Sequence, residues 1–307
     1  MMTRLLQLVV ITVALAMPVA VRADASRRFE STLPESTDSA PTQPSFQPSG
    51  TRPTLGDGWE AYERGEIGLA VRIYRDATTR LPDDALLWYD LGCLYALNHE
   101  FEESRRALRH ALYLNSHLAL GHDALGQIYE QLGEVAIAEA LYTTAMLLEP
   151  ATVKFLRHRV RALLRMNAPQ AARHVMRELL LLEPSDLESR YQLGVLELRA
   201  NAPDLALMEF QKVLAQTPDH VMALNGLALA SIRIGRLEEA TKVLERAKGL
   251  DPTNATTQSN LGLIAAAQQR WLDARSAWQR ALELEPHFAP AEQNLEALNA
   301  MLASPTP

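Results

Sequence analysis

A spacing of 34 residues constrains the fold of this 307-residue chain more than any other feature of its sequence. Prolines recur at this spacing, and Ser116 fills the one gap in a series that consists of Pro82, Pro150, Pro184, Pro218, Pro252 and Pro286. A small residue recurs in the same register at Ala70, Ser104, Ala138, Ala172, Ala206, Ala240 and Ala274. A fixed period of this length is typical of chains built from stacked supersecondary units.

Each period has the pattern of two helices joined by a tight turn. The segment "LGQIYEQLGEVAIAEALYTTAMLLEP" places apolar or small residues at helical spacing both before and after Gly133. Gly133 lies where the first helix ends and Pro150 lies where the second ends, as expected from the free backbone of glycine and the missing N–H of proline. Aromatic residues make up only 6% of the chain, which also favours helices over a β-sandwich.

The repeated residues resemble the tetratricopeptide repeat (TPR) family. The second unit carries Trp88, Leu91-Gly92, Tyr95, Ser104, Leu108 and Ala111 at the positions typical of that family. The resemblance implies an all-α fold, a right-handed α-solenoid of stacked helix-turn-helix repeats. The seven expected units are residues 51–84, 85–118, 119–152, 153–186, 187–220, 221–254 and 255–288.

The two ends of the repeat region are expected to differ from its middle. In the first unit, Pro53 and Gly56 stand where the first helix begins, so we expect that helix to start late or to fray. After the seventh unit, residues 289–302 carry Leu295, Leu298 and Leu302 on one face, which predicts a capping helix. Residues 303–307 form a short tail.

The first 50 residues have the composition of an export signal followed by a linker. Residues 1–23 combine an N-terminal Arg4 with an apolar run from Leu5 to Met17, and we expect cleavage before Asp24. Residues 24–50 are rich in Ser, Thr and Pro and are expected to be a disordered linker. The mature chain is therefore expected to be exported, either periplasmic or secreted, and to contact a membrane only if the N-terminal segment is uncleaved.

The net charge argues against a nucleic-acid-binding protein, and the cysteine content excludes a fold stabilised by internal disulfides. The formal net charge is −7, whereas a nucleic-acid-binding protein needs a large basic surface. Cys93 is the only cysteine, so no intramolecular disulfide can form, and we interpret it as a small buried hydrophobe.

One helix of this acidic chain is strongly basic. In the segment "KFLRHRVRALLR", residues 154–165, six of twelve side chains are Lys, Arg or His. At about 100° per residue, Lys154, Arg157, Arg161 and Arg165 share one helical face. In the TPR family, first-helix residues at these positions line a concave groove, and Arg199 and Arg233 continue the series from Arg165 one repeat at a time.

Two interpretations of this basic stripe stay open at the level of sequence. Asp123, Glu130 and Glu188 occupy neighbouring groove positions and could neutralise the charge internally. Alternatively, the arginines could hold an acidic segment or a C-terminal carboxylate of a protein or peptide partner. Four further residues are candidates for partner contact in the groove: Tyr89, Gln127, Tyr191 and Asn225.

No signature of catalysis or metal binding accompanies the repeats. There is no phosphate-binding loop or nucleophile elbow, and His110, His117 and His122 do not share a helical face. We therefore expect no cofactor, no metal and no enzymatic activity. The predicted function is a non-enzymatic interaction scaffold or adaptor of the cell envelope that binds an acidic or extended peptide. The alternatives are a polyanion- or polysaccharide-binding protein of an envelope assembly or export system, and an assembly spacer that acts through its outer faces.

Overall fold

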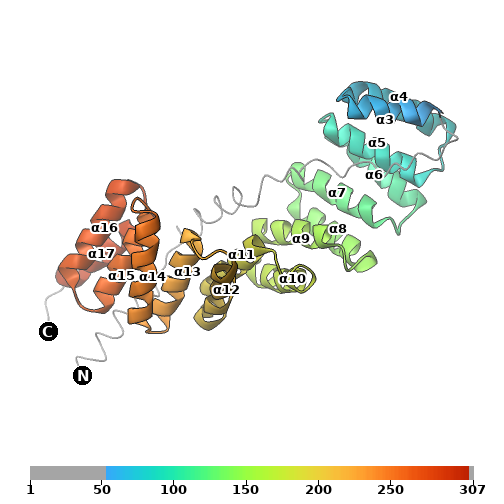
Figure 1. The fold of residues 1–307 in the computed structure, drawn as a ribbon. Helices are drawn as coiled ribbons and strands as arrows, with labels where there is room; N and C mark the ends of the chain where they lie inside the picture. Colours follow the sequence, from blue (N-terminus) through green and yellow to red (C-terminus); the bar gives the residue numbers. More distant parts are fainter. Residues whose placement is uncertain (1–52, 304–307) are drawn as a thin grey trace. The chain divides into compact units, whose positions relative to one another are not determined.

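A computed structural model describes residues 53–303, and within this range the chain contains helices and no strand (Figure 1). This confirms the predicted all-α helical repeat fold. The predicted signal peptide at 1–23 and the predicted linker at 24–50 lie outside the described residues. None of the described helices is both long and apolar enough to cross a membrane.

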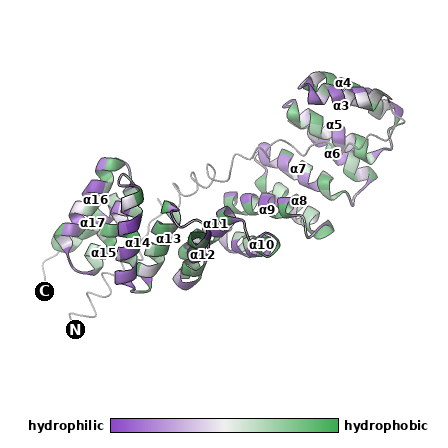
Figure 2. Ribbon diagram, viewed as in Figure 1, coloured by the Kyte–Doolittle hydropathy of each residue, from purple (hydrophilic) through white to green (hydrophobic). Residues whose placement is uncertain are grey.

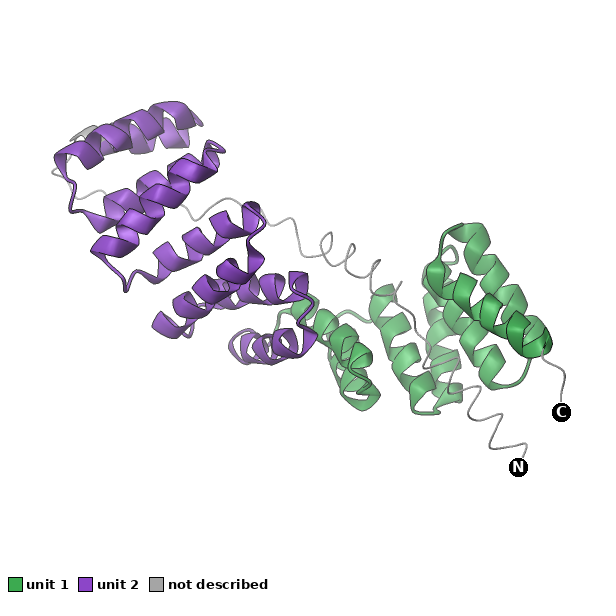
Figure 3. Ribbon diagram, turned by 180° about the vertical axis from the view of Figure 1, so that it is seen from behind, with its two compact units in different colours: residues 1–33, 185–307 green, residues 34–184 purple. Residues whose placement is uncertain are grey.

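The described residues divide into two compact units, coloured separately in Figure 3. We call residues 53–184 the N-terminal unit and residues 185–303 the C-terminal unit. The helices of the N-terminal unit are α3 (Pro53–Glu63), α4 (Ile67–Arg80), α5 (Ala85–Leu97), α6 (Phe101–Leu114), α7 (Ala119–Gln131), α8 (Val135–Leu148), α9 (Val153–Arg165) and α10 (Pro169–Leu182).

The C-terminal unit continues the same alternation of first and second helices. Its helices are α11 (Leu187–Arg199), α12 (Pro203–Gln216), α13 (Val221–Arg233), α14 (Leu237–Leu250), α15 (Ala255–Ala267), α16 (Trp271–Leu284) and α17 (Ala289–Ala303). From α5 to α16, every first helix has 13 residues and every second helix has 14. The first helix, α3, is shorter, with 11 residues.

Each turn between paired helices contains one residue with a left-handed backbone, always at the same repeat position. Glycine occupies that position in three turns, Gly65, Gly133 and Gly235, where the absence of a Cβ makes a positive φ inexpensive. The other four turns use His99, Asn167, Asn201 and Gln269, with φ between 55° and 62°. The left-handed turn therefore belongs to the repeat geometry and does not depend on glycine, which is why the sequence shows it clearly only in part of the array.

Small side chains allow the two helices of each pair to approach closely. All seven residues of the small-residue series, from Ala70 to Ala274, are fully buried. In the second unit, Ser104 also donates a hydrogen bond from Oγ to the carbonyl oxygen of Gly92 at 2.7 Å. Hydrophobic and hydrophilic residues alternate along the helices (Figure 2), as expected when one stripe of each helix packs inward.

The starts of several first helices are fixed by the last residue of the preceding repeat. Asp84 accepts hydrogen bonds from the backbone N–H groups of Leu86 and Leu87, both at 3.1 Å. Asp186 and Asn254 cap α11 and α15 in the same way. These caps satisfy N–H groups that have no partner within the helix, so they define where each unit begins.

The last helix packs on α16 and shields the end of the hydrophobic core. In α17, Leu298 is buried and belongs to the same cluster of apolar side chains as Trp278. Leu295 is partly buried and packs against this cluster, whereas Leu302 is exposed. Cys93 is buried in the core, the environment expected for a small hydrophobe.

Candidate functional site

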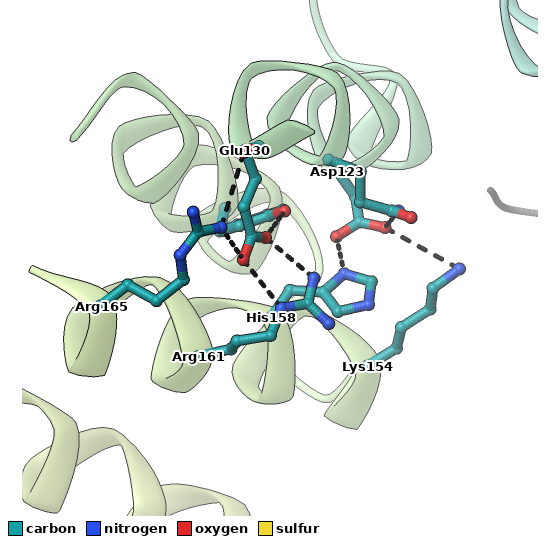
Figure 4. A network of polar contacts seen from close by, with 8 residues as sticks. Asp123, Glu130, Lys154, His158, Arg161 and Arg165 are labelled. Carbon is teal, nitrogen blue, oxygen red and sulfur yellow. Dashed lines mark hydrogen bonds and ion pairs between the residues drawn. The ribbon is translucent and has the colours of Figure 1, made fainter. Parts of the chain in front are cut away.

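The basic helix of the sequence is α9, and its charged side chains face carboxylates of α7 within the N-terminal unit (Figure 4). On the packing side of α9, Leu156, Val160 and Leu163 are buried. This apolar stripe fixes the rotation of the helix and therefore directs the other face, which carries Lys154 and Arg161, toward α7. The site is thus positioned by ordinary amphipathic packing of one repeat on the previous one.

Glu130, near the end of α7, is the centre of one cluster. It is buried and accepts hydrogen bonds from Arg161, from Nε at 3.0 Å and from an Nη at 2.9 Å. Arg165 donates to Oε1 of the same carboxylate at 3.0 Å, and the hydroxyl of Tyr142 donates to Oε2 at 2.8 Å. One buried carboxylate therefore holds two guanidinium groups in fixed orientations.

The environment of Glu130 keeps its carboxylate charged. Burial by itself raises the pKa of Glu130, but hydrogen bonds and charge from Arg161, together with hydrogen bonds from Tyr142 and Arg165, lower it below the usual value. For Arg161, burial favours the neutral form, yet Glu130 more than compensates and the pKa of the guanidinium is raised. Both partners are therefore ionised near neutral pH.

Asp123, one turn into α7, is the centre of a second cluster. Its side chain is fully buried, and Oδ1 lies 2.6 Å from Nδ1 of His158. Oδ2 accepts a hydrogen bond from Nε2 of Gln127 at 2.9 Å, and Lys154 Nζ lies 3.8 Å from the same oxygen. Lys154 is an ion-pair partner beyond hydrogen-bond distance, so it is held less firmly than the other members of the cluster.

The two clusters retain excess positive charge. Lys154, Arg161 and Arg165 contribute three charges, and the carboxylates of Asp123 and Glu130 neutralise two of them. Arg157 forms a separate ion pair with Glu183 at 2.5 Å between half-exposed side chains. Internal neutralisation of the stripe is therefore real but partial. Glu188, a third carboxylate considered for this role, lies in the C-terminal unit and accepts a hydrogen bond from Gln192 at 2.7 Å.

Tyr89 is a sequence-predicted contact residue that the structure places in the core. Its ring is fully buried, in the cluster of apolar side chains that contains Cys93 and Leu125. A partner in a surface groove cannot reach this ring, because the neighbouring helix covers it. The expectation of an aromatic anchor at this position is corrected accordingly.

The remaining predicted residues belong to the C-terminal unit. Asn225 is buried, where it donates hydrogen bonds to Thr257 Oγ1 at 2.9 Å and to the carbonyl oxygen of Val221 at 3.1 Å. Its own Oδ1 accepts from Asn260 at 3.2 Å. The amide therefore joins neighbouring repeats internally, which corrects its prediction as a partner contact.

Tyr191, Arg199 and Arg233 differ in their exposure. The ring of Tyr191 is half-buried against Phe210 and His220, with ring centroids 5.8 and 5.5 Å apart. Arg233 donates to the carbonyl oxygen of Leu198 at 2.5 Å, and burial lowers the pKa of its guanidinium. Arg199 ends α11 and is exposed.

Sequence reasoning missed the role of Tyr142 and the pairing of His158 with Asp123. A usable signal was present in the spacing, since Glu130 precedes Arg161 by 31 residues and Arg165 by 35. With a repeat of 34 residues, the first separation is three residues shorter than one repeat and the second is one residue longer. They place residues of two successive first helices on facing sides, and Asp123 stands in the same relation to Lys154 and His158.

The described residues contain no group of three or more His, Cys, Asp and Glu side chains arranged to hold a metal ion. The polar clusters consist of carboxylates paired with cations, together with the Tyr142 hydroxyl and the Gln127 amide. What they can do chemically is present fixed hydrogen-bond donors and positive charge to a ligand.

Comparison with known families identifies the repeat. A profile described as tetratricopeptide repeat matches residues 55–119, 158–219 and 191–255, and a second profile with the same description matches residues 122–152. Together these matches cover more than half of the chain. No curated protein gives a significant match.

Several solved structures share the fold. The C-terminal part of a TPR repeat-containing protein from Cytophaga hutchinsonii has a TM-score of 0.60 and 14% identity, over 78% of this chain and 99% of that one. YrrB, a TPR protein, has a TM-score of 0.52 and 18% identity, and the match covers 62% of this chain and 99% of YrrB. A tetratricopeptide repeat protein from Parabacteroides merdae has a TM-score of 0.50 and 16% identity, and the match covers 80% of this chain and 97% of that protein. At these identities the similarity shows a common fold.

Proposed function

Since the chain belongs to the tetratricopeptide repeat family, we propose that it is a non-enzymatic scaffold of the cell envelope that binds an acidic protein segment along α9. Proteins of this family typically mediate protein–protein interaction. YrrB is described as having an unusual peptide-binding site, so a peptide ligand is compatible with this fold. The acidic character of the partner is inferred from the chemistry of α9.

The observation that carries the proposal is the uncompensated positive charge beside Asp123 and Glu130. Side chains of the stripe also remain accessible, with 33% of Lys154, 45% of Arg157 and 36% of Arg165 exposed. An arginine offers five N–H donors. Within the described residues, Arg165 is seen to use only one Nη, toward Glu130, which leaves donors for a carboxylate of a partner.

Fixed orientation of the arginines supports binding at low entropic cost. Glu130 holds Arg161 through two hydrogen bonds and Arg165 through another, so these side chains are ordered before a ligand arrives. Preordered side chains lose less conformational entropy on binding than free ones. The internal ion pairs therefore prepare the surface and do not simply compete with a ligand.

Reversal of the accessible charges tests the proposal. Lys154→Glu combined with Arg157→Glu spares the contacts of Glu130, and Lys154 lies 3.8 Å from Asp123, beyond hydrogen-bond distance. Reversal of Arg161 would instead remove two direct hydrogen bonds to the buried Glu130 and destabilise α9. The binding probe is a fluorescein-labelled oligo-glutamate peptide of ten residues, followed by fluorescence anisotropy. We expect the double variant to bind at least about tenfold more weakly, a change of about 1.4 kcal/mol.

A matched control carries Arg236→Glu and Arg280→Glu, since both arginines are exposed and paired with a nearby glutamate. The control should bind the probe like the wild type. An unchanged affinity in the Lys154 and Arg157 double variant contradicts the proposal. Stronger binding of an acidic polysaccharide than of the oligo-glutamate peptide would instead support the polyanion-binding function.

The physiological partner can be captured at the same surface. Photoactivatable benzoylphenylalanine at position 157 should crosslink a partner in intact cells, and the same residue at position 236 should not. Mass spectrometry of the crosslinked peptide then shows whether the captured segment is acidic. A captured segment without acidic residues would contradict the charge-based part of the proposal.

Export to the envelope is a separate part of the proposal. It is supported by the basic start and the apolar run of residues 1–23. N-terminal sequencing of the protein purified from its native cells should give Asp24 as the first residue. Retention of Met1 or Met2 in the mature protein would refute cleavage.

A further inference from the structure

The second helices of the repeats carry an exposed stripe that the α9 surface does not include. In α6 the stripe consists of Glu102, Arg106, Arg109 and Tyr113, and all four side chains are exposed. Their spacing of four, three and four residues places them within an arc of about 60° on the helix. The same repeat positions are exposed or partly exposed in every second helix from α4 to α16.

In the N-terminal unit this stripe is basic, and we call it the basic outer face. It contains Arg72 and Arg75 on α4, Arg106 and Arg109 on α6, and Arg177 on α10, with Glu102 as its only carboxylate. Within the described residues, Arg72, Arg75 and Arg109 form no ion pair. Arg106 pairs with Glu103 at 3.5 Å, but its own side chain is largely exposed and that of Glu103 is partly exposed. An excess of positive charge therefore stays on the surface of an acidic protein.

The basic outer face also carries a row of exposed apolar side chains. Tyr113, Leu147 and Leu181 occupy the same position in three successive repeats and are 83%, 70% and 80% exposed. Between the basic helices, the stripe of α8 carries Ala136 and Ala140 and has no charged residue. Large apolar side chains repeated at one position of a surface helix are typical of an interaction site.

The same stripe is acidic in the C-terminal unit, where we call it the acidic outer face. It contains Asp204 on α12, Glu238 and Glu245 on α14, and Glu283 on α16, with Lys242 as its only basic residue. Exposed apolar side chains accompany the charges, as Met208 is 50% and Leu272 is 80% exposed. Corresponding positions of one repeat family thus carry opposite charge in the two units.

We propose that the basic outer face of one molecule binds the acidic outer face of a second copy of this chain. The charges are complementary, and both faces offer apolar side chains that burial would stabilise. Because the two faces differ, the contact is heterologous, and a pair of bound copies leaves one basic and one acidic face open. Such contacts build chains of molecules unless the rotation between copies closes a ring.

Sedimentation velocity of the mature protein over a range of protein concentrations tests this interface. Association should strengthen with concentration and weaken at high salt, because exposed charges are screened. A basic-face variant carries Arg72→Glu, Arg75→Glu, Arg106→Glu and Arg109→Glu. An acidic-face variant carries Asp204→Lys, Glu238→Lys and Glu245→Lys. Each variant alone should self-associate about tenfold more weakly or not at all.

An equimolar mixture of the two variants provides the decisive measurement. One variant then has only acidic faces and the other only basic faces, so the mixture should regain association that neither variant shows alone. Circular dichroism establishes that both variants remain folded. A control with four exposed arginines off the stripe reversed, Arg64, Arg80, Arg236 and Arg270 to Glu, should associate like the wild type.

Three results would overturn the proposal. They are a wild type that stays monomeric at all concentrations, an association that neither salt nor the charge variants change, and a variant mixture that stays dissociated. A monomeric wild type that sediments with vesicles containing phosphatidylglycerol would assign the basic outer face to anionic membranes instead. The variant with Lys154 and Arg157 reversed should retain self-association, which keeps this test separate from that of the α9 surface.

Discussion

Replacement of Glu130 by glutamine is the sharpest test of how the basic helix is held. The amide has nearly the same shape as the carboxylate, but it lacks the negative charge that faces Arg161 and Arg165. Its NH₂ group also cannot accept a hydrogen bond from Tyr142 or from an arginine. The substitution therefore changes the electrostatics of one buried site with little change in packing volume.

The expected loss of stability follows from the contacts of this carboxylate. Breaking a buried ion pair by removing one partner costs about 3–5 kcal/mol. Glu130 is only 6% exposed and accepts four short hydrogen bonds, but the two arginines are about one third exposed and can turn partly to water. We therefore expect Glu130→Gln to lower the free energy of unfolding by about 2–3 kcal/mol.

Urea unfolding followed by circular dichroism measures this change. Because repeat arrays can unfold in parts, amide hydrogen exchange in α7 and α9 should be measured alongside urea unfolding. Glu183→Gln is the matched control, because Glu183 is 40% exposed and pairs with the half-exposed Arg157, so it should cost no more than about 0.5 kcal/mol. Equal losses in the two variants would refute the reasoning, since burial would then make no difference to the pair.

Further predictions concern pH, helix packing and turn geometry. Burial raises the pKa of Glu130, yet Arg161 and its other hydrogen-bond partners lower it overall, so the unfolded chain binds this proton more tightly than the folded protein. The free energy of unfolding should therefore fall as the pH drops below the ordinary glutamate range and through the pKa of Glu130 in the folded protein. Over the same pH range, the urea midpoint of Glu130→Gln should decrease less than that of the wild type. Gly126→Ala would place a Cβ 2.6 Å from the Tyr142 ring and should cost about 1–3 kcal/mol, whereas Gly68→Ala, with nothing within 4 Å, should be neutral or slightly stabilising; equal urea midpoints for the two variants would contradict this. Gln269→Gly should stabilise the protein by about 0.5–1 kcal/mol, because a non-glycine residue there has a φ of 62°, and a lower thermal midpoint would count against this account of the turn.

Much of the fold could be read from the period alone. Every first helix from α5 to α15 begins at the first residue of a unit set out from the sequence, because the capping residue, the turn and the proline recur at fixed positions. All residues of the small-residue series are fully buried, as expected for small side chains between paired helices. Periodicity is a local signal repeated seven times, so it accumulates along the chain.

The candidate site was only partly predictable from the sequence. Lys154, Arg161 and Arg165 were correctly assigned to one helical face, because a single helix fixes that geometry. Side chains of the preceding repeat were named as partners, but the sequence could not show which carboxylate takes which cation. Tyr89 and Asn225 were misjudged because a first-helix position predicts which side a residue faces, not whether a neighbouring helix covers it.

The sequence by itself determined the type of repeat, its period of 34 residues and the presence of a basic stripe in an acidic protein. These properties depend on spacing along one chain, where each helix fixes its own geometry. Only the tertiary structure decided that Glu130 holds two arginines, that Asp123 takes His158, and that positive charge remains at the surface. Those outcomes depend on distances of a few ångströms between side chains of different repeats, and side-chain packing sets such distances.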